Sequence, residues 1–414
     1  MQIAIIGSGI SGMVCAYLLA EDHEVTVFEA NDYVGGHTHT VDVDAGGRRY
    51  GIDTGFIVFN EWTYPNFIKI LQRLGVPSKP STMSFSVRCE DSGLEYSGTS
   101  LNGLFAQRRN LWRPEFYRML FDIVRFCRDG NRFLEKGDDE CTMSEFLFRQ
   151  GYSALMRQQF LTPMMSAIWS SAPNAIERFP AKHSLRFFKN HGLLNIWHRP
   201  QWRTIQGGSH CYIGPMTARY YNRIRLNSPV LAIQRSPEGV FVTPAGGQRE
   251  RFDHVIIATH SDQALRMLAD PSDREREILG SLHYQENDTV LHCDVNLLPH
   301  SHRAWASWNY HFVSAAQERP MVTYNMNMLQ SIKAPETFCV TLNRRGAIAS
   351  EKTLGTFEYH HPLFTLEGLR AQKRHGEISG VNRTHYCGAY WGYGFHEDGV
   401  NSALAACRFF GKGL

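Results

Sequence analysis

The chain has 414 residues, enough to bury more than one hydrophobic core, which favours two domains. Its 43 basic and 40 acidic side chains nearly cancel, so no global electric field selects a partner. Nine scattered cysteines form no CxxC pair, which predicts a reduced compartment and argues against a disulfide framework or a metal site. No run of about 18 apolar residues occurs, so any membrane contact is expected to be peripheral.

The first thirty residues predict a strand, a glycine-rich turn, a helix and a second strand. IAIIG reads as a buried strand, MVCAYLLAE has helical apolar spacing, and EVTVFEA ends at Glu29. In GSGISG, Gly7 permits a tight turn, Gly9 lets the backbone approach a pyrophosphate, and Gly12 lets helix and strand pack closely. The helix amino terminus, with Ser11, faces the phosphates, and Glu29 is placed to accept ribose hydroxyls. The segment therefore predicts dinucleotide binding.

The next stretch favours FAD over NAD. Gly35 and Gly36 in NDYVGGHTHT resemble the second glycine pair of the flavoproteins that include amine oxidases, protoporphyrinogen oxidases and phytoene desaturases. In that superfamily the pair runs beside the diphosphate and ribityl chain, and a basic residue usually follows. Here His37 takes that place, with Thr38 after it. The resemblance implies a non-covalent FAD held in part by these four residues; an ordinary turn is the alternative.

Two further segments are similar to the same superfamily. GIDTGFIVF resembles the strand and turn near the flavin, which implies cofactor contacts from Thr54, Gly55 and Phe56. IQGGSHCY, NSPVLAIQR and FDHVIIATH resemble the glycine pair and the small sheet that return the chain to the nucleotide domain. Val230 would then contact adenine through its backbone, although a plain sheet-core role fits it equally well.

The segment THYCGAYWGYGFHEDGVNSALAACRFF resembles the last strand and helix of this superfamily. The resemblance places Gly388 near the ribityl phosphate and a helix amino terminus, around Gly399, Val400 and Asn401, at the flavin ring. Backbone amides and the helix dipole would there favour the negative charge of a reduced flavin by about 1 kcal/mol. The acidic residue that usually follows the glycine is replaced by Ala389.

An aromatic insertion, WGYGFHEDG, separates that glycine from the helix. Its side chains could stand around the flavin ring, with a neutral imidazole or a partly desolvated carboxylate taking a proton. The alternative is a packed loop with its histidine and glutamate in solvent. The candidates for catalysis in this insertion are Trp391, Tyr393, His396 and Glu397.

The resemblance implies an α/β fold with a Rossmann-type FAD-binding domain, glutathione-reductase-like and of the amine oxidase type. That domain would be discontinuous and comprise residues 1–75, 205–275 and 380–414. Residues 76–204 and 276–379 would form the substrate domain, with a mixed or antiparallel sheet plus helices. SFSVRCEDSGLEYSG predicts a hairpin, and TVLHCDVNLL, MVTYNMNML and TFCVTLN predict strands.

The region between the hairpin and residue 205 is predicted to be helical. Pro114 can open a helix, with one apolar face made by Phe116, Leu120, Ile123, Val124 and Cys127. Thr142 and Glu145 have the spacing of a capping box.

A basic stretch runs from Arg178 to Arg235, with ten Lys and Arg residues, no Asp or Glu, and several interleaved aromatics. Such a mixture suits the headgroups of an anionic membrane or a nucleic acid. A flavoprotein scaffold disfavours nucleic acid, which leaves peripheral contact with the inner face of a membrane or an ordinary basic surface. The protein is accordingly expected in the cytoplasm.

Only one dinucleotide fingerprint is visible, so the substrate itself is expected to reduce the flavin. YCGAYWGYGFHEDGVNSAL and EYHHPLF are similar to a bacterial branch of the superfamily associated with cyclopropane-fatty-acid-synthase-like methyltransferases. That resemblance implies desaturation of methyl-branched fatty acyl chains, with a methyltransferase as functional partner. A redox-neutral acyl or polyene isomerase, a lipid-presenting accessory protein and an amine oxidase are the alternatives.

Overall fold

The first strand, β1 (Gln2–Ile6), is buried on both of its faces. Ile3 and Ile5 pack into one hydrophobic core, and Ala4 and Ile6 pack into another. An uninterrupted apolar strand of this kind belongs inside a parallel sheet. The computed structural model, which describes residues 1–313 and 319–414, places it in a five-stranded parallel sheet of order β10-β2-β1-β14-β20. The other strands are β2 (Glu24–Phe28), β10 (Ile224–Arg225), β14 (His254–Ile257) and β20 (Thr384–Tyr386).

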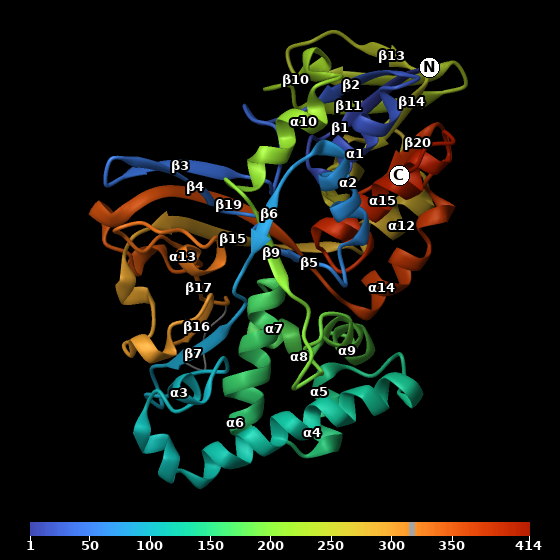
Figure 1. The fold of residues 1–414 in the computed structure, drawn as a ribbon. Coiled ribbons are helices and arrows are strands. Elements are labelled where there is room, and N and C mark those ends of the chain that lie inside the picture. The colour runs from blue at the N-terminus through green and yellow to red at the C-terminus, as the bar shows by residue number, and fades with distance from the viewer. Residues whose placement is uncertain (314–318) are drawn as a thin grey trace.

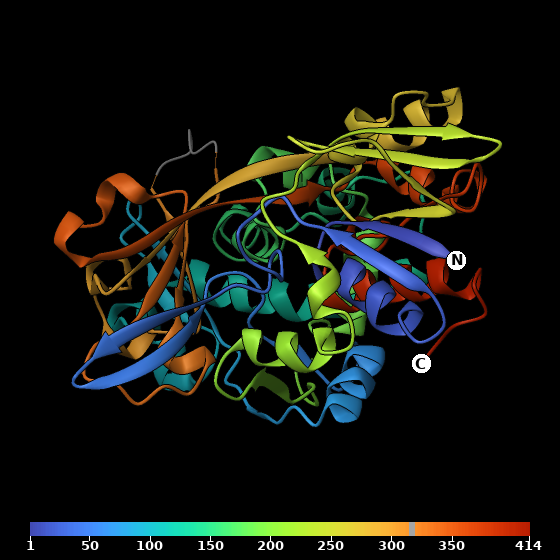
Figure 2. The same ribbon diagram turned by 90° about the horizontal axis from the view of Figure 1, so that it is seen from above.

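Both faces of the parallel sheet are covered. One face packs against α1 (Ile10–Leu19) and α15 (His396–Arg408). The other face packs against a three-stranded antiparallel sheet and two helices, namely β11 (Val230–Ser236), β12 (Gly239–Pro244), β13 (Glu250–Phe252), α11 (Ser261–Met267) and α12 (Asp273–Gly280). Ala371 in α14 (Leu366–Lys373) and Ile378 share this core, although they precede the domain boundary predicted at residue 380. Both marked chain ends lie beside this layer (Figures 1 and 2).

The second sheet has seven strands in the order β19-β15-β18-β17-β16-β7-β8. Neighbouring strands are antiparallel except β16 and β7, so the predicted mixed sheet is confirmed. Its strands are β7 (Phe85–Cys89), β8 (Glu95–Ser97), β15 (His283–His292), β16 (Trp308–Phe312), β17 (Val322–Asn325), β18 (Cys339–Leu342) and β19 (Thr353–Leu363). The long pair β15 and β19 runs through the middle of the molecule, towards the parallel-sheet layer (Figure 1).

Helices fill the end of the molecule away from the parallel sheet (Figure 1). They are α4 (Pro114–Lys136), α5 (Met143–Gln150), α6 (Ala154–Met156), α7 (Thr162–Trp169), α8 (Pro173–Glu177) and α9 (Ala181–Asn190). The predicted start of α4 and the predicted capping box of α5 are confirmed, since Thr142 and Glu145 each accept the other's backbone N–H. The predicted apolar face of α4 is wrong at Val124, which is 50% exposed.

Two further small sheets and four further α-helices complete the set of strands and α-helices in the described residues. They are the hairpin of β3 (Thr40–Ala45) and β4 (Arg48–Asp53), the small sheet of β5 (Phe59–Asn60), β6 (Ser78–Pro80) and β9 (Trp202–Ile205), and the helices α2 (Pro65–Leu74), α3 (Leu101–Leu104), α10 (Ile213–Thr217) and α13 (Met326–Leu329). Within the described ranges, none of the helices is both long and apolar enough to cross a bilayer. The same ranges contain no group of three His, Cys, Asp or Glu side chains arranged for a metal ion.

The basic stretch from Arg178 to Arg235 does not form one surface. It starts beside α8 and extends through α9 and β10 into β11, so it crosses from the helical end to the parallel-sheet layer. Five of its ten basic side chains make ion pairs, namely Lys182, Arg203, Arg219, Arg225 and Arg235. Half of the positive charge in this stretch is therefore compensated by acidic residues from other segments.

Candidate cofactor and substrate site

A cavity of about 810 Å³ opens at the carboxyl ends of the parallel strands. The segments that follow β1, β2, β14 and β20 all contribute to its wall, at residues 7–11, 29–31, 258–260 and 388–390. Ligands of open α/β sheets bind in this place, because the strand ends and the helix amino termini converge there. The same cavity extends to the edge of the seven-stranded sheet and to α7.

The glycine turn after β1 forms one wall of the cavity. Gly7 has a φ of 97°, which turns the chain at the end of β1, and it donates its N–H to Phe28 O at 2.8 Å, which continues the pairing of β1 with β2. A Cβ on Gly12 would lie 2.0 Å from Gly7 O, so this position requires glycine for the close packing of helix and strand. A Cβ on Gly9 would meet nothing within 4 Å, because Gly9 faces the open cavity. Gly9 thus leaves room for a phosphate beside the amino terminus of α1.

The side chain of Glu29 is held rigidly at one end of the cavity. Its Oε2 accepts the Ser8 N–H at 2.8 Å and the Ser8 hydroxyl at 2.5 Å, and its Oε1 accepts the Asn31 N–H at 2.9 Å. Val230 lines the same end. A fixed carboxylate beside a backbone strand suits the hydroxyls of a ribose and the edge of a base, as the sequence predicts.

The second glycine pair lies directly against the first turn. A Cβ on Gly36 would lie 3.1 Å from Gly9 Cα, and Gly36 has a φ of 58°. Gly35 has a φ of 133° and belongs to the wall behind, since a Cβ there would lie 2.4 Å from Thr38 O. Two loops from different parts of the chain therefore meet through their backbones beside the space at Gly9.

The middle of the cavity contains polar atoms that a bound ligand could satisfy. His37 Nε2 and the Tyr390 hydroxyl are buried and lack a hydrogen-bond partner among the described residues. Buried polar groups normally have partners, so an enclosed ligand is the expected one. The pKa of His37 is lowered to about 4, mainly by burial and to a smaller extent by the charge of His360. His37 is therefore neutral at pH 7 and does not replace the positive charge usual at this position.

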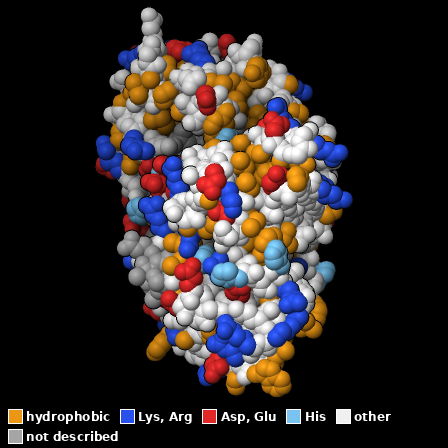
Figure 3. Space-filling view, turned by 90° about the vertical axis from the view of Figure 1, so that its left-hand side faces the viewer, with side chains coloured by type: hydrophobic (Ala, Val, Ile, Leu, Met, Phe, Trp, Pro, Cys, Tyr) orange, Lys and Arg blue, Asp and Glu red, His pale blue; other side chains and the backbone are white. Residues whose placement is uncertain are grey.

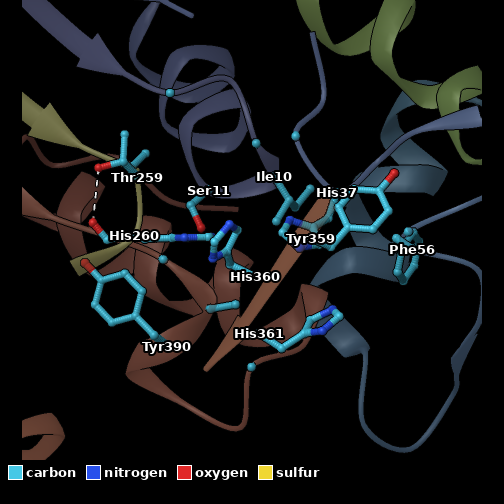
Figure 4. A pocket seen from close by; sticks show the side chains of 18 of the residues that line it. Ile10, Ser11, His37, Phe56, Thr259, His260, Tyr359, His360, His361 and Tyr390 are labelled. Carbon is cyan, nitrogen blue, oxygen red and sulfur yellow. Dashed lines mark hydrogen bonds between the residues drawn. The ribbon is translucent and has the colours of Figure 1, made fainter. Parts of the chain in front are cut away.

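Histidines and tyrosines from three segments gather around this point (Figure 4). The His37 ring lies 5.1 Å from the Tyr359 ring, 5.6 Å from His361 and 6.2 Å from His260. His361 Nδ1 lies 3.0 Å from the Asn287 amide nitrogen. Burial lowers the pKa of both His260 and His361 to about 3, with neighbouring histidines adding to the effect. The cluster is thus a set of neutral imidazoles.

The sequence did not identify the residues of β19 in this cluster. EYHHPLF carries part of the family resemblance, but no role in the site was predicted for Tyr359 or His361. The sequence signal for this site was a pair of consecutive histidines in a strand. Successive side chains of a strand point to opposite faces of the sheet. Both histidines nevertheless line the cavity, and His360 also lies beside Glu358, with Nε2 3.0 Å from Oε1.

His396 stands at the cavity as the first residue of α15. Its ring stacks on Phe56 with centroids 3.5 Å apart, and its Nε2 lies 3.1 Å from Thr38 Oγ1 and 3.2 Å from the Tyr212 hydroxyl. Burial holds the pKa of His396 well below its usual value. Thr38 supports this imidazole from behind and does not itself line the cavity.

The predicted start of the last helix is wrong by one turn. Asp398 accepts the Phe395 N–H at 3.0 Å, which closes a capping box and begins α15 at His396. The three residues predicted at the helix start consequently miss the cavity. Gly399 O accepts the Ser11 hydroxyl at 3.0 Å, Val400 is fully buried in the core, and Asn401 accepts a hydrogen bond from Asn66.

Two of the four candidate catalytic residues also lie outside the cavity. Glu397 accepts the backbone N–H groups of Asn66 and Phe67 at 3.0 and 2.9 Å, so it caps the first turn of α2. Trp391 packs against His375, with ring centroids 4.3 Å apart. The solvated loop that was the alternative is not observed either, because Glu397 is buried. The predicted residues that do line the cavity are Gly7, Gly9, Ser11, Glu29, Gly36, His37, Thr54, Gly55, Phe56, Val230, Gly388, Tyr393 and His396.

The end of the cavity opposite Glu29 is apolar. Its wall is formed by Ile168 and Trp169 of α7 and by Trp308, Tyr324 and Leu342 of the seven-stranded sheet. Charged side chains along the described lining are limited to Glu29, Arg266 and Glu358. Arg266 pairs with Asp262, and Glu358 is 64% exposed. This end therefore suits an uncharged, hydrophobic group.

Comparison with known proteins gives a consistent picture. The family model of flavin containing amine oxidoreductases matches residues 10–293. The putative flavin-containing monoamine oxidase AofH of Mycobacterium tuberculosis is 26% identical over 288 residues, which cover 66% of this chain and 59% of that protein. L-amino acid oxidase Bs29 of Bothriechis schlegelii is 23% identical over 322 residues, covering 70% of this chain and 59% of that protein. The match thus spans about 59% of the length of these curated relatives.

Two solved structures share the fold over nearly the whole chain. Putrescine oxidase bound to putrescine has a TM-score of 0.69 at 15% identity, covering 99% of both chains. The CLA-producing fatty acid isomerase from P. acnes has a TM-score of 0.67 at 18% identity, covering 99% of this chain and 98% of that one. At these identities the likeness concerns the fold alone.

The geometry around Gly9 and Glu29 predicts two variants that lose flavin. Gly9→Val fills the space beside α1, and Glu29→Ala removes a buried acceptor at a cost of about 1–3 kcal/mol. We expect both proteins to be purified with little bound FAD, measured by flavin absorbance after acid release. Gly346→Ala is the control for expression and purification, because Gly346 is exposed, has no positive φ, and a Cβ there would meet no atom within 4 Å. Wild-type occupancy in both site variants would refute the assignment.

The neutral histidine cluster predicts a stability that falls in acid. An unfolded histidine has a pKa of about 6.5, whereas folding lowers the pKa of His37 to about 4 and of His361 to about 3. Below pH 6.5 the unfolded chain therefore binds protons that the folded chain does not, and the free energy of unfolding decreases until about pH 4. His361→Gln should reduce the slope by about 1.4 kcal/mol per pH unit in urea titrations. A variant at the exposed His302 is the control. If His361→Gln has the same slope as wild type and as this control, the prediction is wrong.

The capping role of Glu397 predicts a change in stability. Glu397→Ala leaves two buried N–H groups of α2 without acceptors, at a cost of about 1–3 kcal/mol. Thermal unfolding of the flavin-loaded protein should show a lower Tm. A Tm within the error of wild type would mean that water or another group satisfies these amides.

Proposed function

Because the chain belongs to the family of flavin-containing amine oxidoreductases, FAD is its cofactor, and we propose that it oxidises the acyl chain of a lipid. The apolar end of the cavity is the observation that carries this proposal. A methyl-branched fatty acyl chain of a phospholipid is the substrate that also agrees with the sequence resemblance.

We infer that the parallel sheet is the Rossmann-type, glutathione-reductase-like half of the protein. Glu29 would hold the adenosine ribose, and Gly9, Ser11 and Gly36 would surround the diphosphate. The flavin would then lie towards His37, where two unpartnered polar atoms, His37 Nε2 and the Tyr390 hydroxyl, line the cavity. A non-covalent attachment fits Cys387, whose Sγ lies 3.9 Å from Cys15 Sγ in the core and not at the cavity.

The choice of lipid over amine rests on charge. An ammonium group entering the apolar end would lose its hydration, and the described wall there offers no buried carboxylate in return. An acyl chain loses no hydration of this kind, and it gains contact with Trp169, Trp308 and Tyr324. An amine oxidase is therefore the weaker alternative.

FAD supplies the acceptor for a hydride from a C–H bond of the substrate. The carbon that loses the hydride becomes cationic, and the aromatic faces of the wall stabilise that charge. A neutral imidazole can take the proton from the neighbouring carbon, which leaves a double bond. His396 is buried and His361 half-buried, and both are neutral and line the cavity, whereas Glu397 accepts hydrogen bonds from the first turn of α2. Oxygen or a membrane quinone would accept the electrons afterwards.

The proposal includes a cytoplasmic location and a fatty acid methyltransferase that supplies the branched chain. Two alternatives remain as outcomes of the test. A redox-neutral isomerase would return the hydride to the same chain, and an accessory protein would bind lipid without chemistry.

Anaerobic mixing with phospholipids that carry methyl-branched chains distinguishes these functions. We expect lasting loss of the oxidised-flavin absorbance together with a product two mass units lighter. Product without lasting bleaching would indicate an isomerase, and bleaching by amines alone would indicate an amine oxidase. If neither class of compound changes the flavin or is changed, the accessory role stands and the proposal is wrong.

The two imidazoles at the cavity predict a kinetic effect. His396→Gln and His361→Gln should keep FAD, because neither side chain lies at the glycine turns, and at least one should slow flavin reduction by roughly tenfold, about 1.4 kcal/mol in the barrier. Trp391→Phe is the matched control, since Trp391 belongs to the same segment but lies outside the cavity. Stopped-flow reduction by lipid measures all three. Wild-type rates for both histidine variants would remove the imidazole base from the scheme.

A further inference from the structure

Helix α4 has an apolar stripe on its solvent side. Its core side is formed by Phe116, Met119 and Phe126, which are buried. Tyr117, Phe121 and Val124 follow the spacing i, i+4 and i+7 on the opposite side, and all three are exposed. Phe121 is 65% exposed, so the stripe is open to solvent. A surface helix normally carries polar side chains there, and this helix therefore has two apolar faces.

The segment before α4 extends the same exposed surface. Trp112, at the end of the short 3-10 helix Arg108–Trp112, is 87% exposed, and Leu111 beside it is 41% exposed. The Tyr117 hydroxyl donates to Leu111 O at 3.0 Å, which joins this segment to the stripe. We call the exposed residues Leu111, Trp112, Tyr117, Phe121 and Val124 the α4 outer face. Figure 3 shows apolar side chains with basic ones among them at the lower end of the molecule, where Figure 1 places α3 and α4.

The charge around the α4 outer face is positive. Residues 108–132 contain seven arginines and three acidic residues. Two of the acids are buried and already hydrogen-bonded. Asp122 accepts hydrogen bonds from Arg125 and the Ser153 N–H. Asp129 accepts them from Arg128 and the Tyr152 hydroxyl. Glu115 is the one exposed acid of this range. Arg113, Arg118 and Arg132 have no ion pair among the described residues.

Helical geometry places these arginines beside the apolar stripe. At 100° per residue, Arg128 continues the line of Phe121 and Val124, while Arg118 and Arg132 lie along one side of it. Exposed aromatic and aliphatic side chains bordered by arginines match the boundary between the headgroups and acyl chains of an anionic bilayer. The helix lies across the lower end of the molecule (Figure 1), so one plane can touch its whole length.

From these contacts we infer that the α4 outer face docks the protein on an anionic lipid bilayer. Trp112, Phe121 and Val124 enter the level of the acyl-chain boundary, and the arginines contact the phosphates. The inference goes beyond the proposed reaction, because docking needs no bound substrate and no flavin chemistry. It also moves the membrane contact away from the stretch between Arg178 and Arg235, whose charges are dispersed and half paired.

The test is flotation of the FAD-loaded protein with vesicles of phosphatidylcholine alone or mixed with phosphatidylglycerol. We expect binding that requires phosphatidylglycerol and weakens with added salt, because exposed charges are screened within about 8–10 Å. W112S/F121S and R113E/R118E should each reduce binding by roughly tenfold or more. All these side chains lie outside the cavity, so bound flavin and Tm should stay at wild-type values.

W197S/R199E is the matched control, because Trp197 is 84% exposed and belongs to the other basic stretch. It should bind vesicles as wild type does. Loss of binding in this variant alone would assign the membrane contact to residues 178–235 and overturn the inference. Unchanged vesicle binding in both α4 variants would also overturn it, and a changed mass in sedimentation would then identify the face as an interface between copies of the chain. Failure of lipid oxidation has no bearing on these outcomes, since no turnover is measured.

Discussion

The approach of two backbone loops at Gly9 and Gly36 is the constraint on which the site depends. A side chain at Gly36 would press on Gly9, and a side chain at Gly9 would fill the cavity. Because both positions are glycine, the turn after β1 and the loop after β2 leave a space bounded by peptide groups and the amino terminus of α1. Peptide N–H groups bind phosphate without introducing charge of their own, so the remaining wall can stay largely uncharged.

The uncharged character of the wall continues along the cavity. His37, His260 and His361 are neutral because burial disfavours the imidazolium, and neighbouring histidines, His360 among them in each case, lower the pKa of each ring as well. Neutral imidazoles can still donate and accept protons, unlike the aromatic rings next to them. The protein thus combines groups competent for proton transfer with an environment that a hydrocarbon can enter.

The sequence predicted the parts of the site that depend on local backbone geometry. The turn at Gly7, Gly9 and Gly12 and the acid at Glu29 follow from strand, helix and strand in fixed order, and the structure shows the geometry predicted for them. Five of the seven strands of the second sheet and the capping box at Thr142 were predicted for the same reason, whereas β16 and β19 were not predicted. Their signals lie within a few neighbouring residues.

Features that depend on distant contacts could not be predicted in this way. Glu397 looked like a candidate base, but its partners are backbone groups of α2, some 330 residues away in the chain. Helix α15 begins one turn earlier than predicted. Asp398 accepts the Phe395 N–H in a capping box, and this starts the helix before the glycine at which it was expected to begin. His361 reaches the cavity only because β19 pairs with β15 and thereby fixes which face each side chain occupies.

The walls of the cavity come from segments that are synthesised at very different times. Residues 7–11 leave the ribosome early, whereas β20 and the start of α15, which complete the same sheet and the same wall, follow almost four hundred residues later. Until then α1 lacks the helix that covers it, and its apolar residues have no partner on that side. The space around the cofactor can therefore be enclosed only after these last segments have been made.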